Sequence, residues 1–66
     1  MQITVNGEKV QMVQGQSVED ILKNKDLLGK RMAVEYNGCI LPRSLYEQTM
    51  LSEGDELEIV MAVGGG

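Results

Sequence analysis

The chain has 66 residues, with ten acidic and six basic side chains and a net charge of −4 at pH 7. A chain of this length forms one domain that buries only about 60% of the surface its unfolded form exposes, which leaves no room for an enclosed substrate pocket. The negative charge repels phosphate backbones and anionic lipid surfaces. We therefore expect neither a self-contained enzyme nor a protein that binds nucleic acid or membranes.

Residues for metal or redox chemistry are scarce. Histidine and tryptophan are absent, and Cys39 is the only cysteine. A lone thiol cannot form an internal disulfide or supply a structural zinc site, which uses four ligands. We expect Cys39 to be a half-buried thiol in a strand, and the chain itself to bind no metal or cofactor. The lack of a disulfide framework, of a charged leader and of a run of ~20 apolar residues predicts a soluble, cytoplasmic protein.

The first elements form a hairpin followed by a helix. Residues 1–5 alternate with period two, and a second run, Val10 to Val13, follows the turn signal Asn6-Gly7. We expect Ile3 and Val5 to face the core. Next, Ser17 and Asp20 form a capping pair that starts a helix ending near Lys25. The apolar stripe of this helix contains Val18, Ile21, Leu22 and Leu28.

A second hairpin follows the helix. Two short strands, Met32–Tyr36 and Cys39–Leu41, flank Asn37-Gly38, which is a two-residue turn signal. This turn pairs Tyr36 with Cys39 and places Ile40 on the face opposite Val34, where it is a candidate exposed apolar residue. Pro42 ends the strand because it lacks an amide hydrogen. An irregular or single-turn crossing over residues 43–47 then leads toward the last strand.

The last strand, Glu56–Met61, alternates between the two faces of the sheet, with Leu57, Ile59 and Met61 predicted to point inward. The order of elements predicts an α+β protein with a mixed sheet of about five strands and one main helix packed on one face. Because the crossover rule favours a helix that joins strands of one sheet, we expect a β-grasp in which the last strand is central and parallel to the first.

Glycines are concentrated after the last strand. We expect a domain over residues 1–62 and a flexible tail over residues 63–66, which spans roughly 13 to 14 Å when fully extended. A terminal carboxyl group has a pKa of about 3.3 to 3.7 and is ionised at neutral pH. The Gly66 carboxylate is sterically open, which suits adenylation by a partner. We expect the residues that thread into that partner to be Val63, Gly64 and Gly65.

Three stretches of the chain form a recognisable combination. They are Met1-Gln2-Ile3-Thr4-Val5-Asn6-Gly7, Val34-Glu35-Tyr36-Asn37-Gly38 with Pro42-Arg43-Ser44, and Gly54-Asp55-Glu56-Leu57-Glu58-Ile59-Val60 leading to Ala62-Val63-Gly64-Gly65-Gly66. The combination resembles the ThiS family of thiamin-biosynthesis sulfur carriers, which are ubiquitin-like, and it covers essentially the whole chain. The family's terminal glycine pair corresponds to Gly65 and Gly66.

This resemblance implies a protein co-substrate and not an enzyme. It implies that a ubiquitin-activating-like adenylyltransferase, using ATP and magnesium, adenylates Gly66. It also implies that a sulfur-donating enzyme helps to convert the adenylate into a thiocarboxylate. The loaded protein would then dock on thiazole synthase and donate sulfur for the thiazole ring. Two alternatives stay open: a sulfur carrier for molybdopterin, cysteine or transfer-RNA thiolation, or a β-grasp interaction module or protein tag.

A carrier with several partners needs a recognition surface. The alternation of the strands predicts a partner-binding surface on the open sheet face, formed by Ala33, Ile40, Val60 and Ala62. These residues could equally be isolated exposed aliphatic side chains. Arg43 either pairs with a partner carboxylate or caps a local turn. A dense acidic stretch near the tail is predicted to be a solvated edge and contains Glu53, Asp55, Glu56 and Glu58.

Overall fold

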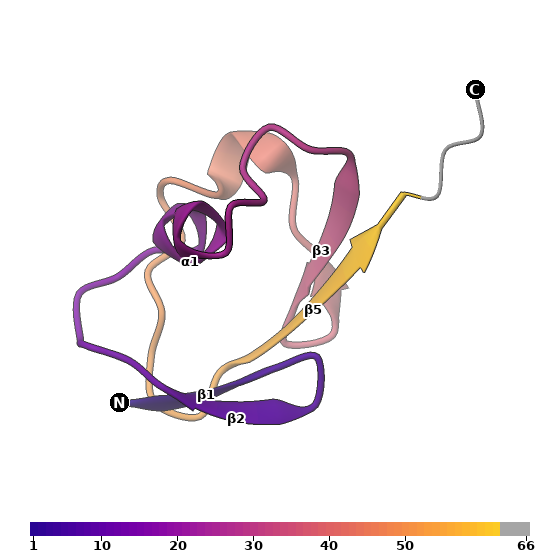
Figure 1. The fold of residues 1–66 in the computed structure, drawn as a ribbon. Coiled ribbons are helices and arrows are strands. Elements are labelled where there is room, and N and C mark those ends of the chain that lie inside the picture. Colours follow the sequence, from indigo (N-terminus) through magenta and orange to yellow (C-terminus); the bar gives the residue numbers. More distant parts are fainter. Residues whose placement is uncertain (63–66) are drawn as a thin grey trace.

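The computed structural model describes residues 1–62 and places one α-helix against one face of a five-stranded sheet (Figure 1). The α-helix is α1 (Val18–Asn24), and a short 3₁₀ helix, η1 (Arg43–Leu45), forms the predicted crossing. The strands are β1 (Gln2–Val5), β2 (Glu8–Gln11), β3 (Met32–Tyr36), β4 (Cys39–Ile40) and β5 (Glu56–Met61).

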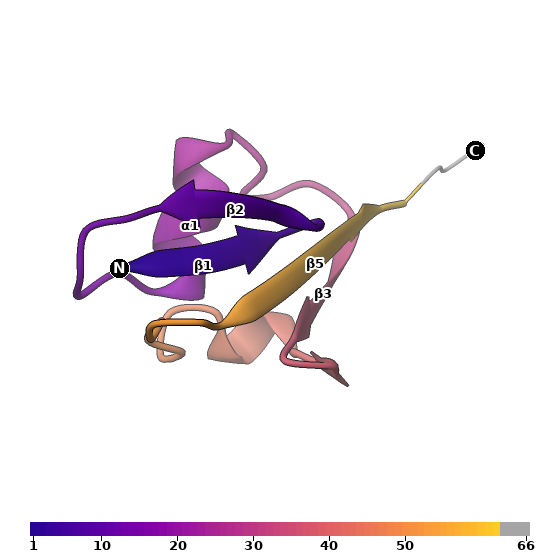
Figure 2. The same cartoon turned by 90° about the horizontal axis from the view of Figure 1, so that it is seen from below.

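The order of strands across the sheet is β2-β1-β5-β3-β4. β5 is therefore central; it runs parallel to β1 and antiparallel to β3. Figure 2 shows the sheet from its open side, with α1 behind β1 and β2. This arrangement confirms the β-grasp prediction, including the parallel pairing of the first and last strands. The C-terminal strand β5 thus has a neighbouring strand on each side.

The first hairpin turns earlier than the sequence pattern predicts. Asn6 and Gly7 both have positive φ, 51° and 83°, and form a two-residue turn that brings Val5 opposite Glu8. Such a turn matches the right-handed twist of the strands it connects. The prediction of a strand over Val10–Val13 was therefore wrong: β2 begins at Glu8, and Val13 lies beyond its end with 74% of its surface exposed.

The second hairpin has the predicted register. Tyr36 pairs with Cys39 and Glu35 with Ile40 across the Asn37-Gly38 turn. Ile40 is 66% exposed, as expected. The prediction of a half-buried Cys39 was wrong, because this thiol is exposed on β4, which is one of the two edge strands of the sheet.

The core lies between α1 and the sheet. The predicted capping box is present: the Asp20 amide donates to Ser17 Oγ at 3.2 Å, and the Ser17 amide donates to Asp20 Oδ2 at 2.9 Å. The backbone hydrogen bond from Ser17 lowers the pKa of Asp20 below its usual value. The buried core residues are Ile3, Val5, Val18, Ile21, Leu22, Val34, Tyr46, Leu51, Leu57 and Ile59.

Two predicted core positions lie at its boundary. Leu28 is 42% exposed because α1 ends at Asn24, and Leu27 packs against the core in its place. Met61 was predicted to point inward but is 39% exposed, since it lies at the end of β5. Its cross-strand partner, Met32, is only partly buried.

Candidate functional site

The end of β5 positions the root of the predicted tail. Ala62 donates its amide to the Arg31 carbonyl at 3.0 Å, so the ladder with β3 continues one residue past β5. Figure 1 shows this end of β5 directed away from α1 and from the β1-β2 hairpin. The predicted acceptor Gly66 and the predicted threading residues lie outside the described residues; the latter are Val63, Gly64 and Gly65. The sheet thus holds the last described residue at its margin, away from the core.

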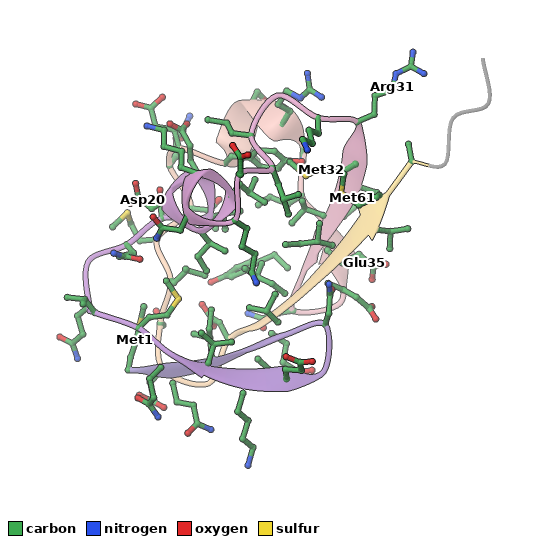
Figure 3. The ribbon with its side chains drawn as sticks, in the orientation of Figure 1. Met1, Asp20, Arg31, Met32, Glu35 and Met61 are labelled. Carbon is green, nitrogen blue, oxygen red and sulfur yellow. The ribbon has the colours of Figure 1, made fainter. Side chains whose placement is uncertain are left out.

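A shallow hollow of about 460 Å³ lies at this margin of the sheet. Met32 and Met61 lie opposite each other at the ends of their strands, and Figure 3 shows both on the part of the sheet near Arg31, the residue that precedes β3. Methionine side chains adapt to different partner surfaces because they are unbranched and polarisable. The hollow is lined by Arg31, Met32, Ala33, Arg43, Val60, Met61 and Ala62.

The predicted partner-binding residues are all exposed. Ala33 and Val60 are direct cross-strand partners, and both line the hollow together with Ala62. Ile40 is separated from them because it lies on β4, beside Glu35. The structure therefore brings three of the four residues together, while Ile40 extends the same open face toward the edge of the sheet.

The acidic part of the open face lies next to this apolar group. Glu35 and Glu58 are direct cross-strand partners on β3 and β5, and Glu56 precedes Glu58 on the same face. These three side chains line a shallow depression of about 230 Å³. Figure 3 shows Glu35 on the side of the sheet away from α1. The acidic stretch of the sequence is therefore partly a feature of the open face.

Asp55 does not belong to that solvated stretch, so this part of the prediction was wrong. It is only 9% exposed and accepts hydrogen bonds from the Tyr36 hydroxyl at 2.7 Å, the Ser52 amide at 2.8 Å and the Asn37 side-chain amide at 3.2 Å. Burial raises the pKa of Asp55, but these hydrogen bonds outweigh burial, and the net pKa is below its usual value. The hydrogen bond from the Tyr36 hydroxyl to Asp55 raises the pKa of Tyr36.

Two asparagine side chains complete this link between the turns and β5. Asn37 Oδ1 accepts from the Glu56 amide at 2.8 Å, and Asn6 Oδ1 accepts from the Ile59 amide at 2.7 Å. Asn6 and Asn37 are also the first residues of their two-residue turns, and both have positive φ, 51° and 50°. Sequence reasoning assigned them only to the turns. The structure adds that both turns hold the central strand, which in turn positions Ala62.

Comparison with known proteins assigns the chain to a family. A family model described as the ThiS family matches residues 2–66. The chain belongs to the ThiS family. The sulfur carrier protein ThiS of Escherichia coli strain K12 is 30% identical over 66 residues, and the match covers all of both chains. A crystal structure of the thiamine biosynthesis protein ThiS from Geobacter metallireducens shares 31% identity and a TM-score of 0.78, again with full coverage of both chains.

This member of the ThiS family also resembles part of a larger protein. A thiazole synthase of Paramagnetospirillum magneticum is 38% identical over 66 residues, which are all of this chain but only 20% of that protein. The chain thus spans about a fifth of the length of that relative. Within residues 1–62, no helix is long and apolar enough to cross a membrane, and no group of three or more potential metal-binding side chains is present.

Proposed function

We propose that this chain is a sulfur carrier for thiazole formation in thiamin biosynthesis and that the Gly66 carboxylate carries the sulfur. The observation with the greatest weight is the match to the E. coli sulfur carrier over the full length of both chains. The β-grasp fold and the direction of β5 support the proposal, because they place the last described residue at the sheet margin. The domain then acts as a handle for its own terminal carboxylate.

The proposed reaction takes place in the active sites of partner enzymes. The Gly66 carboxylate attacks the α-phosphate of ATP, pyrophosphate leaves, and the product is an acyl adenylate. Hydrosulfide then attacks the acyl carbon, the bond between that carbon and the AMP oxygen breaks, and AMP leaves, so that the chain ends in a thiocarboxylate. The adenylyltransferase binds ATP and magnesium and positions the reactants. In this proposal the chain is a co-substrate and not a catalyst. The use of ATP by the adenylyltransferase agrees with a cytoplasmic location.

Thiazole synthase is the proposed sulfur acceptor enzyme, and a separate enzyme donates the sulfur. A relative named thiazole synthase contains a segment similar to this entire chain. This joining of the two in one protein supports a functional association between the sulfur carrier and thiazole synthase. The proposed docking surface consists of the exposed residues Ala33, Ile40, Val60 and Ala62. Because the adenylyltransferase and thiazole synthase would both bind the tail and its surroundings, they would bind the carrier one after the other.

Intact mass spectrometry tests the proposal. The native chain is incubated with the thiamin-pathway adenylyltransferase, ATP, magnesium and a sulfur source, beside a control chain that lacks Gly66. We expect the mass of the native chain to increase by the difference between one sulfur and one oxygen, and the control to stay unchanged. An unchanged native chain would contradict the proposal. Loading followed by delivery to an acceptor other than the thiazole synthase would identify a carrier of another pathway.

A further inference from the structure

The open face of the sheet has an ordered distribution of charge along β3 and β5. Three successive cross-strand pairs lie on this face. The pair nearest the tail is Arg31 with Ala62, the next is Ala33 with Val60, and the third is Glu35 with Glu58. The face therefore changes from basic through apolar to acidic over four residues of strand, which corresponds to about 13 Å.

Neighbouring residues strengthen both ends of this gradient. Arg43 lines the hollow that contains Arg31 and Ala33, and both arginines are exposed. Glu56 adds a third carboxylate at the acidic end, where Glu56 and Glu58 are both exposed. Within residues 1–62, the salt bridge between Lys23 and Glu19 lies on α1 and does not involve either end of the gradient.

The pairing of Glu35 with Glu58 is unfavourable for the isolated domain. Like charges directly opposite each other on neighbouring strands destabilise a sheet. Basic side chains of a partner would relieve this repulsion, because a desolvated carboxylate forms strong hydrogen bonds with Arg or Lys. The acidic end is therefore better suited to a complex than to the free protein.

We propose that this face docks thiazole synthase in one orientation, with basic side chains of that enzyme opposite Glu35, Glu56 and Glu58 and carboxylates opposite Arg31 and Arg43. This inference rests on the proposed function and adds the polarity of the interface. Docking in the reverse direction would place like charges together, which costs affinity and rejects that orientation. The favoured orientation turns the end of β5 toward the part of the enzyme that carries the carboxylates.

Surface plasmon resonance tests this polarity. We would measure association rates with purified thiazole synthase of the same organism, at low and at high salt. Glu58→Gln and Arg31→Gln each remove one charge from one end of the face. Glu47→Gln and Lys25→Gln are the matched controls, because both side chains are exposed and lie outside β3 and β5. The unloaded native chain is used throughout, so the measurement does not depend on sulfur chemistry.

Both variants of the face should slow association by about two- to fivefold at low salt, since charges at an interface rim act mainly on the association rate. The effect should vanish near 1 M salt, where the Debye length is about 3 Å, and the controls should match the native chain. If Arg31→Gln instead accelerates association, the partner surface is uniformly basic and the proposed polarity is wrong.

Three other outcomes would also overturn the inference. Equal slowing by Glu58→Gln and Glu47→Gln would reduce the effect to net charge. Absence of binding by the native chain would exclude thiazole synthase as the occupant. Slowing of association by the face variants with the adenylyltransferase, but not with thiazole synthase, would exclude it as well. The mass experiment above separates this inference from the proposed function: a chain that is loaded normally but lacks the charge pattern refutes the docking orientation alone.

Discussion

The two faces of the sheet are built from the same strands but differ in what their side chains contact. On the helix side, Val34 and Ile59 are 1% and 8% exposed and pack beneath α1. On the open side, their chain neighbours Ala33 and Val60 are exposed, and Val60 retains 55% of its surface. The comparison separates two tasks: the helix side holds the fold together, and the open side is available for recognition. Substitutions on the helix side should therefore lower stability, whereas substitutions on the open side should weaken binding.

The largest loss of stability is expected on the helix side. Leu22 is fully buried in α1, so Leu22→Ala should lower the free energy of unfolding by about 2–5 kcal/mol, through lost burial and the cavity left behind. Urea unfolding followed by circular dichroism measures this change. Leu28→Ala is the matched control, because Leu28 is 42% exposed and should lose much less. Equal losses at the two leucines would contradict the assignment of the core.

The next largest effect is expected at the buried carboxylate that links the second hairpin to β5. Asp55→Asn leaves the donors from Tyr36, Ser52 and Asn37 with one acceptor oxygen, and should cost about 1–3 kcal/mol. Asp26→Asn is the control, since Asp26 is exposed and asparagine tolerates its positive φ of 58°. No loss in Asp55→Asn would show that this network does not stabilise the fold.

The stabilising effect of Asp55 should also depend on pH. Its folded pKa is lowered below the unfolded value of about 3.9, so the stabilisation is complete above that pH and is lost as the pH falls through the folded pKa. The difference in unfolding free energy between the native chain and Asp55→Asn should therefore shrink below about pH 4. A difference that stays constant down to pH 2 would contradict this linkage.

A smaller effect is expected at the start of α1. Ser17→Ala removes the hydroxyl that accepts from the Asp20 amide, and loss of such a cap costs about 1 kcal/mol. Thermal unfolding measures the change. Ser17→Asp retains an acceptor at this position and should recover part of the stability of the native chain. If Ser17→Ala is as stable as the native chain, the capping box contributes nothing to stability.

The smallest effect on stability is expected on the open face. Val60→Asp should lower the free energy of unfolding by less than about 1 kcal/mol, because the side chain is already exposed and mainly strand propensity is lost. Its affinity for thiazole synthase should nevertheless fall at least about tenfold, as expected when a charge enters an apolar interface. Val13→Asp, outside the strands, is the control. Unchanged affinity in Val60→Asp would exclude this face from docking.

The regular features of the fold were predictable because each depends on a local pattern. Asn37-Gly38 determined the register of the second hairpin, and Ser17 with Asp20 determined the start of α1. The long-range contacts were not predictable in this way. Tyr46 and Leu51 complete the core from irregular segments, where no periodicity marks them as buried. In the sequence, Asp55 is one of several acids in an acidic run, and nothing marks it as buried. Only folding brings its three hydrogen-bond donors together.

The candidate site was predictable to a similar extent. Alternation along β3 and β5 correctly placed Ala33 and Val60 on the exposed face. It could not show that Glu35 lies opposite Glu58, because pairing between strands distant in the sequence depends on the register of the whole sheet. Gly66 was identified from its chemistry and its place in the chain, and it stays a prediction.

The most direct test of the division between the two faces is methyl NMR of the native chain during titration with thiazole synthase. Val60 and Ile59 are adjacent in β5 but point to opposite faces, so each serves as the control for the other. We predict that the methyl signals of Val60 and Ile40 shift or broaden, whereas those of Ile59, Val34 and Leu22 stay nearly unchanged. Changes confined to the helix-side methyl groups would contradict the account.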